Sequence, residues 1–450
     1  MVEVGLALSS IQGRSDNASF GPPSGLGWNT ALTDVTATQT GGGYAVNVNP
    51  RGLVDPAIWA GQAYHVDGVA GNDSSSGIGA FDGDFSTAKK SIHSAFSAGN
   101  ASGNPYRVLV KAGNFEGSAF TKNGQVEPSQ PVAIMGWGGA VRYRTGPNEL
   151  IWVDAGGTYT CGISSLNRLF RTDALTSNGL YTELTLAPDI ASCQSTVDTW
   201  FKSGSTVHIN IGRAPGLHDI AAMRNFNGAR FMSHTDDLYL EDIHCEGGIT
   251  GALHCDPQAD RNVVGVNCSF RYSSPSNVNS PLDAVKVRRT NGLVAFFDCD
   301  ASGGAKDGWS FHDDGYGEMN VLMSNCTGFE NGAFSATSCN GFTAHDAVVS
   351  AVVGGSYGYS RNGAEVHLIQ NARAWFLGTT AIARDPDGSC VGFKCSNATK
   401  MWLENTQADA AGGAVSNLAI EANGGSVFVR DHVTISGVNS AYGGGSITAY

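Results

Sequence analysis

The sequence of 450 residues is poor in charge and contains no long apolar run. Only 15% of its residues are charged. No hydrophobic stretch approaches the length of about 18 residues that marks a membrane-spanning helix, so we expect no membrane insertion. The opening, MVEVGLALSSIQGR, lacks the basic start, apolar core and small-residue cleavage site of a signal peptide. We therefore expect no signal-directed export.

Positive charge is also scarce, because 27 basic residues face 40 acidic ones and leave a net charge of −13. A nucleic-acid-binding protein would carry a basic stripe, so that class of partner is excluded. The ten cysteines form no CxxC pair and no Cys/His zinc spacing. We expect them to be buried free thiols, in a chain that folds in a reducing compartment.

What the sequence does contain is a repeat between Arg230 and Gly424. Aligned segments alternate apolar and polar residues and end in turns, as strands do. Their spacing of roughly 22 to 33 residues is typical of solenoids. One outward position of the alignment carries His234, Asp256, Arg288, His312, His345, His367, Lys394 and Glu421.

A second series supports the same register. Four strand-like runs end in cysteine (Cys245, Cys268, Cys299 and Cys326), and Asn or Asp precedes three of them (Asn267, Asp298 and Asn325). The equivalent places in later units read VVGGS, FLGTT and WLENT. Sixty glycines suit a fold with several tight turns per repeat. We predict an all-β protein, a right-handed single-stranded parallel β-helix.

The pattern also predicts how the chain is divided. Residues 1–60 are rich in Gly, Ser and Thr and are expected to form an arm or attachment segment. Residues 61–104 hold a first strand and a short helix, with Phe85, Ala88, Ile92 and Phe96 on one face, that caps the open end of the coil. The β-helix is expected over 105–430, with an excursion at about 160–205, and a C-terminal cap over 431–450.

The string YHVDGVAGND, followed by a helical segment and VLVKAGNF, resembles the opening of pectate-lyase-like β-helix proteins, and most of all bacteriophage tailspikes and tail fibres. The resemblance implies a homotrimer on the virion tail, assembled in the host cytoplasm and attached through its N-terminal arm. It also implies binding, and often cleavage, of a surface polysaccharide. We expect no cofactor. A secreted polysaccharide lyase is the alternative location and activity.

The aligned column predicts a site on the coil. His312, His345 and His367 would be three consecutive imidazoles between Arg288 and Lys394, about 4.8 Å apart. Like charges lower one another's pKa, so most of these histidines should be neutral at pH 7 and able to act as general bases. A groove over rungs 286–367 would bind an acidic glycan through cations and aromatic rings, here Lys286, Arg288, Arg289, His367, Lys394, Tyr357 and Tyr359.

Carboxylates follow two of these histidines. Asp313 and Asp346 should stack roughly 5 Å apart, the separation found in retaining glycosidases. Pairing of Asp314 with Asp346, or across to Glu365, would instead give the wider separation of inverting enzymes. A lyase would use His312 or His345 as its base, with Lys286 and Arg288 neutralising a uronate.

These residues also have purely structural explanations. Identical side chains stack in β-helices for packing alone, and Asp commonly caps turns. A metal site from His312, Asp313, His345 and Asp346 is disfavoured, because strand alternation points each His away from the following Asp. Three functions remain open: a glycan depolymerase, a non-catalytic receptor-binding or structural tail protein, and a secreted lyase.

Overall fold

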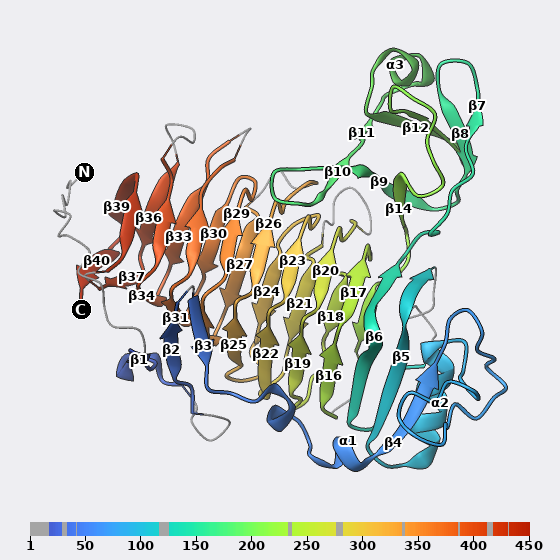
Figure 1. The fold of residues 1–450 in the computed structure, drawn as a ribbon. Coiled ribbons are helices and arrows are strands. Elements are labelled where there is room, and N and C mark those ends of the chain that lie inside the picture. The colour runs from blue at the N-terminus through green and yellow to red at the C-terminus, as the bar shows by residue number, and fades with distance from the viewer. Residues whose placement is uncertain are drawn as a thin grey trace.

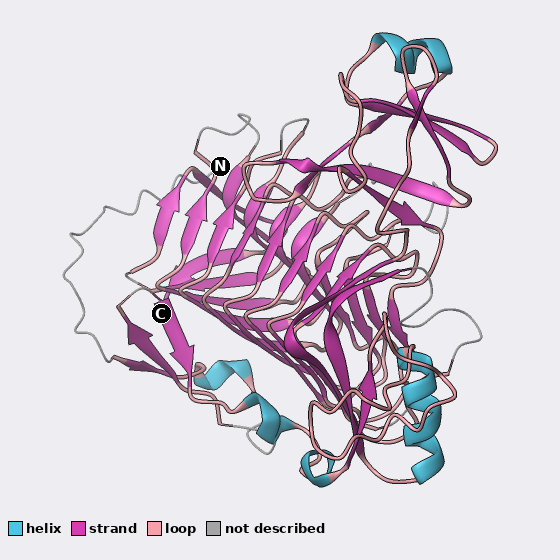
Figure 2. Cartoon of the chain, turned by 45° about the vertical axis from the view of Figure 1, so that its right-hand side comes forward, coloured by secondary structure: helices cyan, strands magenta, loops and turns pink. Residues whose placement is uncertain are grey.

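The computed structural model describes residues 18–28, 34–41, 43–116, 126–232, 236–275, 282–334, 338–385, 388–411, 417–430 and 432–450. The chain winds into a long coil in which each turn adds one strand to each of three parallel sheets, as Figures 1 and 2 show. The predicted parallel β-helix is thereby confirmed. No helix in the described ranges is both long and apolar enough to cross a bilayer.

Sheet 1 has nine parallel strands: β15 (Ala229–Phe231), β18 (Leu253–Cys255), β21 (Val285–Arg288), β24 (Trp309–His312), β27 (Asn340–His345), β30 (Ala364–Leu368), β33 (Val391–Ser396), β36 (Leu418–Asn423) and β39 (Val438–Tyr442). Alternate side chains point into the coil. The inward series runs through Trp309, Phe342 and Phe393, all with no exposed surface. The core is therefore a stack of side chains from successive rungs.

Sheet 2 runs along the next face of the coil: β4 (Gln62–Val66), β5 (Tyr106–Glu116), β6 (Val132–Arg144), β16 (Leu238–Glu241), β19 (Val263–Val266), β22 (Leu293–Phe297), β25 (Asn320–Ser324), β28 (Val349–Val353), β31 (Arg373–Leu377), β34 (Lys400–Glu404), β37 (Ser426–Val429) and β40 (Ser446–Ala449). Its outer face is apolar and is covered by the N-terminal segment, which packs Phe20, Leu26 and Val35 against Trp375 and Trp402.

That covering segment comprises β1 (Ser19–Phe20), η1 (Ser24–Leu26), β2 (Ala37–Thr40), β3 (Gly43–Val46), η2 (Pro50–Leu53) and α1 (Ala57–Ala60). Its described part lies along the coil (Figure 1).

Sheet 3 completes each turn: β17 (Ile243–Glu246), β20 (Ser269–Arg271), β23 (Asp300–Ser302), β26 (Thr327–Phe329), β29 (Ser356–Gly358), β32 (Thr380–Ile382), β35 (Gln407–Asp409) and β38 (Thr434–Ser436). The C-terminal halves of β5 and β6 extend it at one end.

The corner between sheets 2 and 3 is one left-handed residue per rung. The series is Asp242, Asn267, Asp298, Asn325, Gly354, Gly378 and Asn405, with φ between 50° and 67°. The Asn/Asp series predicted from the sequence thus marks a real column. Asn and Gly recur there because they adopt positive φ at low cost.

The cysteine series is only partly in register. Ser269 pairs with Asp300 and Asp300 with Thr327, so the preceding Cys268, Cys299 and Cys326 stack. Cys245 pairs with Phe270 instead, two residues further along the strand. All ten cysteines are free thiols.

The capping helix, α2 (Ile92–Ser102), begins later than the apolar pattern suggested. Ser91 is its N-cap and Gly103 ends it with a positive φ of 66°. Ile92 and Phe96 are fully buried and join the core at the end of the coil. Phe85 and Ala88 precede the helix, because Ser91 starts it.

The excursion is larger than predicted and forms an antiparallel module with its own core. It contains β7 (Val153–Asp154), β8 (Tyr159–Gly162), β9 (Leu166–Leu175), β10 (Tyr181–Glu183), β11 (Thr185–Leu186), α3 (Ile190–Ser195), β12 (Thr199–Ser203), β13 (Thr206–Asn210) and β14 (Ile220–Arg224). The run LIWVDAG (residues 150–156), which lies within the range expected for the β-helix, belongs to this module. In the sequence, a short apolar strand of a module looks the same as one of a rung. Figure 1 shows the module beside the N-terminal end of the coil.

The left-handed corner yields a stability prediction. Replacing Asn325 by Val should lower the free energy of unfolding by about 1–2 kcal/mol, because a β-branched residue is strained at positive φ. Asn325→Gly should cost less, since Gly354 and Gly378 already occupy this corner on the next two rungs. Urea unfolding of both variants tests this. A lower free energy of unfolding for Asn325→Gly than for Asn325→Val would contradict it.

Candidate functional site

The predicted histidine column is real at its centre. β24 pairs with β27 so that His312 lies beside His345, and their rings stack with centroids 4.0 Å apart and planes 14° apart. The Nε2 of His312 lies 3.0 Å from the Ser310 hydroxyl. Both histidines stand at the ends of their strands, at the rim of sheet 1.

The third imidazole is not in this stack, and that part of the prediction was wrong. His367 pairs with Thr343 and then with Lys394, so it belongs to the neighbouring outward column. That column reads Arg230, His254, Lys286, Ser310, Thr343, His367, Lys394 and Glu421. A slip of two residues keeps every side chain on the same face, so apolar alternation could not reveal it. His234 lies outside the described residues.

The groove expected over rungs 286–367 does not open at this second column. Ser310 is 1% exposed and Thr343 has no exposed surface. Lys394 is held by Glu421 at 2.9 Å, and Lys286 lies 3.6 Å from Asp283. These cations therefore neutralise carboxylates of the chain itself.

Burial keeps the stacked imidazoles neutral. Burial, and then the charge of His345, lowers the pKa of His312 to about 3. Burial, and then Lys306, lowers the pKa of His345 to about 4. Neutrality at pH 7 was predicted from mutual repulsion, but desolvation is the larger cause.

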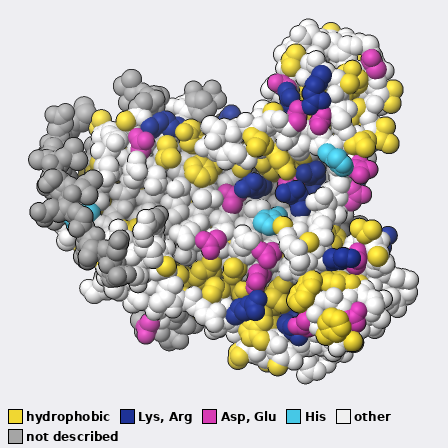
Figure 3. All heavy atoms as spheres, viewed as in Figure 1, with side chains coloured by type: hydrophobic (Ala, Val, Ile, Leu, Met, Phe, Trp, Pro, Cys, Tyr) yellow, Lys and Arg dark blue, Asp and Glu magenta, His cyan; other side chains and the backbone are white. Residues whose placement is uncertain are grey.

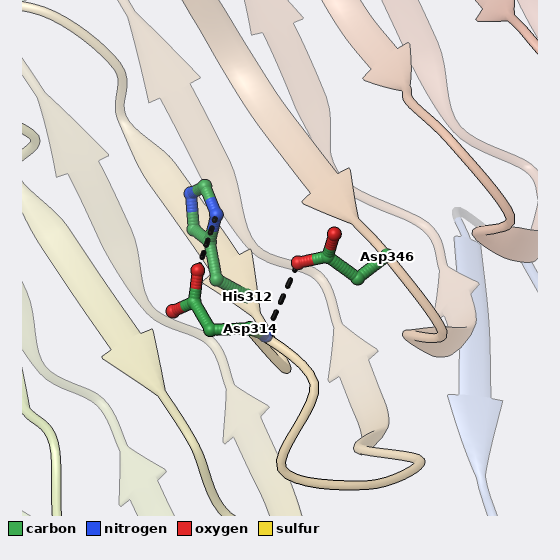
Figure 4. Close-up of side chains that lie close together, drawn as sticks. All are labelled: His312, Asp314 and Asp346. Atoms are coloured by element: carbon green, nitrogen blue, oxygen red, sulfur yellow. Dashed lines mark hydrogen bonds and ion pairs between the residues drawn. The ribbon is translucent and has the colours of Figure 1, made fainter.

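Asp313 is a turn residue whose charge acts on Asp346, and its pairing with Asp346 as a catalytic carboxylate stays a prediction. Its side chain is buried, with one oxygen accepting the Gly315 N–H at 2.7 Å and the other the Ala347 N–H at 2.8 Å. The structure instead brings Asp314 together with Asp346. With His312, these residues offer ligand atoms that all lie within 4.8 Å of one another. Figure 4 shows how the three side chains lie.

Asp314 and Asp346 occupy the left-handed corners that end β24 and β27, with φ of 50° and 60°. A ladder of side chains runs through these corners. The N–H of Gln370 donates to Asn397, the N–H of Asp346 donates to Gln370, and the N–H of Asp314 donates to Asp346.

The ladder ends at Asp314. On the preceding rung the N–H of Arg289 donates to the His312 carbonyl, and the Asp314 carboxylate accepts instead from the Arg288 guanidinium at 2.6 Å. Asp314 is therefore the member whose side chain does not support a turn. It is 27% exposed.

The two carboxyl groups have pKa values shifted in opposite directions. Burial raises the pKa of Asp346, and the charges of Asp313 and Asp314 raise it further. Burial also acts to raise the pKa of Asp314, but the hydrogen bond and charge of Arg288 outweigh it and leave that pKa lowered. Two neighbouring carboxyl groups whose pKa values are shifted apart in this way are what acid–base catalysis requires. We call Asp314 and Asp346 the divided carboxyl pair.

The same three side chains have the ligand types of a metal site. Arg288, however, already holds one Asp314 oxygen and adds a positive charge where a cation would bind. Repulsion between the guanidinium and a metal ion disfavours that use.

The remaining predicted residues lie elsewhere. Arg289 is bound through two hydrogen bonds of 2.6 Å to Asp256. Tyr357 was expected to be a sugar platform, but it points inward and has no exposed surface, so that prediction was wrong. Tyr359 lies next to it at a left-handed corner with φ of 64° and is partly exposed.

Glu365 has no exposed surface and accepts from Ser360 N–H and Oγ and from Cys390 Sγ. It lies opposite Gly341, between the pairs Asn340–Ala364 and Phe342–Val366. That place is five residues, or roughly 16 Å, from Asp346 along the strand direction. A pairing of Glu365 with Asp346 is thus ruled out by the register. Burial raises the pKa of Glu365 to about 7.

The sequence reasoning missed a second charged cluster, on the outer face of sheet 3. It consists of Arg142, Arg144, His244, Glu246, Arg271 and Asp300. Figure 3 shows basic, acidic and histidine side chains gathered there, in the hollow beside the antiparallel module. The signal was hidden because β6 and β17 are neighbours in space but separated in sequence by the module.

No protein-family model matches the chain, and no curated protein matches it. Among solved structures it is similar to one described as a glycoside hydrolase, with 9% identity and a TM-score of 0.44 over 86% of this chain and 96% of that one. It is also similar to pectate lyase Pel9A, with 12% identity and a TM-score of 0.35 over 85% and 78%.

A third is the Gp54 tailspike of Acinetobacter baumannii bacteriophage AP22, in complex with A. baumannii capsular saccharide, with 10% identity and a TM-score of 0.21 over 80% and 69%. At such identities the chemistry of this chain has to be derived from its own side chains.

The neutral histidines give a pH prediction. Burial, and then Lys394, lowers the pKa of His367 to about 3, below the value of about 6.5 of an unfolded chain. The stability contributed by this group is present above pH 6.5 and is lost as the pH falls toward 3. His367→Gln should flatten the fall in unfolding free energy between pH 6.5 and 4 by up to about 1.4 kcal/mol per pH unit. Urea unfolding across this range measures it, and parallel curves for both proteins would refute it.

Proposed function

We propose that this chain binds and cleaves a bacterial surface polysaccharide by hydrolysis, with Asp314 and Asp346 as its catalytic pair. The observation that carries the proposal is the divided carboxyl pair at the rim of sheet 1. The two groups offer oxygens within 4.8 Å of each other, and their pKa values move in opposite directions.

The roles follow from the environments. Asp346, whose pKa is the raised one of the pair, is assigned as the acid that donates a proton to the glycosidic oxygen as the bond from that oxygen to the anomeric carbon breaks. Asp314, kept ionised by Arg288, forms a bond to the anomeric carbon. Water then adds to that carbon, Asp346 takes the proton of the water, and the bond to Asp314 breaks. Oxygens of the two groups lie within 4.8 Å of each other, which supports this retaining course because inverting pairs are held about 6.5–9.5 Å apart to admit a water.

Elimination is less well supported. A lyase needs a base that is effective near neutral pH, and the pKa values of His312 and His345 are lowered to about 3 and about 4. The cations that would neutralise a uronate at the rim, Lys286 and Arg288, are already paired with Asp283 and Asp314.

The biological setting is part of the proposal. We propose a homotrimer on a virion tail that meets its glycan outside the cell and is attached through a part of residues 1–60. Sedimentation of the purified full chain tests the trimer. The non-catalytic alternative, a receptor-binding tail protein, would bind the same glycans and release no new ends.

Substitution of either carboxylate should abolish cleavage. We expect Asp314→Asn and Asp346→Asn to lower the rate at least 100-fold, in line with the loss of a nucleophile or a general acid. Purified capsule and lipopolysaccharide preparations are incubated with each variant, and reducing ends and absorbance near 235 nm are followed. Hydrolysis gives reducing ends without absorbance.

Asp298→Asn is the matched control, because Asp298 is an exposed left-handed corner residue on another edge of the coil. It should cleave at the wild-type rate. Full activity in both rim variants, or absorbance rising together with reducing ends, would contradict the proposal.

A further inference from the structure

The antiparallel module lies against the outer face of sheet 3 at the N-terminal end of the coil. Arg168 of the module is 2% exposed and donates to the carbonyls of Ser273 and Gly303 at 2.7 and 2.8 Å. The Tyr181 N–H donates to the Tyr272 hydroxyl, and the two rings stack 5.2 Å apart. These contacts fix the module against the coil and shape the hollow seen in Figure 3.

Strand register arranges the floor of this hollow in two outward columns. Arg142, His244, Ser269 and Asp300 follow one another in the first. Arg144, Glu246, Arg271 and Ser302 follow one another in the second. We call this surface the sheet 3 cleft.

Most charges in the sheet 3 cleft are already matched. Arg144 binds Glu246 at 2.7 Å, and Arg271 binds Asp300 at 2.5 Å. Glu116, beside Arg144 on the outer rung, accepts the Asn148 N–H at 2.7 Å.

Arg142 is the exception. Its ion pair is a longer contact of 3.4 Å, from Nε to the Glu246 carboxylate that Arg144 already occupies. Within the described residues it has no carboxylate to itself, and its side chain is 48% exposed.

Neutral hydrogen-bonding groups surround this arginine. His244 pairs with Arg142 in register and directs Nδ1 to the Ser269 hydroxyl at 2.9 Å, which leaves Nε2 for a ligand. Burial, and then Arg142 and Arg271, lowers the pKa of His244, so its ring is neutral at pH 7. The Tyr181 hydroxyl contacts Glu246 at 3.4 Å, and its ring is partly exposed beside the same floor.

We infer that the sheet 3 cleft is a second, non-catalytic glycan site, which binds the carboxylate of an acidic sugar through Arg142. The planar guanidinium matches a carboxylate with two parallel N–H donors. The neutral His244 and the Tyr181 ring would contact the hydroxyls and the apolar face of that sugar. The inference rests on the proposed function for the class of ligand and adds that the polysaccharide carries uronic acid.

The test measures binding and not cleavage. Titration calorimetry of the full chain uses hexamers of mannuronate and of hyaluronan as acidic probes, with maltohexaose as the neutral probe. The acidic hexamers should bind, more weakly as salt rises, and maltohexaose should bind at least 10-fold more weakly. Arg142→Gln should reduce acidic binding at least 10-fold, and Arg142→Lys should restore only part of it, because lysine lacks the paired donors.

Arg51→Gln is the matched control, since Arg51 is exposed and has its own carboxylate in Glu241 at 3.0 Å. It should bind the acidic hexamers as the wild type does. If no glycan is cleaved but binding still depends on Arg142, the cleft stands and the proposed hydrolysis fails. If the wild type binds neither acidic hexamer, or Arg142→Gln binds them with the affinity of the wild type, the inference is overturned.

Discussion

The hydrogen-bonded register between successive rungs is the constraint on which the rest of the structure depends. Neighbouring parallel strands lie about 4.8 Å apart, so any residue type repeated at one position becomes a column of touching side chains. The stacked rings of His312 and His345 and the neighbouring carboxyls of Asp314 and Asp346 are products of this spacing. A site built in this way needs no loop to assemble it, because the backbone ladder holds each member in place.

The same spacing that concentrates function also creates strain and repulsion that the fold has to relieve. The left-handed corners between sheets 2 and 3 are filled by Asn, Asp and Gly, and stacked imidazoles remain uncharged because burial lowers their pKa. Ladder side chains satisfy the N–H groups of the corners. The Asp314 carboxylate supports no corner N–H and accepts a hydrogen bond from Arg288 instead. This corner residue is therefore available for chemistry.

The sequence predicted the coil, the corner column and the place of the rim, because apolar alternation and turn residues are local signals. It could not fix the register along a strand. A two-residue slip leaves the apolar pattern unchanged, which is why His367 and Cys245 were assigned to the wrong columns.

Which of two adjacent aspartates supports a turn depends on hydrogen bonds that the pattern does not contain, so Asp313 was preferred to Asp314. The sheet 3 cleft was missed because its strands come from segments separated by a whole module.

The most direct test of the central claim is the stereochemistry of the first product. Proton NMR of the reaction mixture in its first minutes, before mutarotation, reports the configuration of the newly formed anomeric centre. Carboxyl groups whose oxygens lie within 4.8 Å of each other leave no room for a water between them, which predicts that the configuration of the cleaved bond is retained. An inverted anomer, or an unsaturated sugar at the new end, would contradict the assignment of Asp314 as nucleophile and Asp346 as acid.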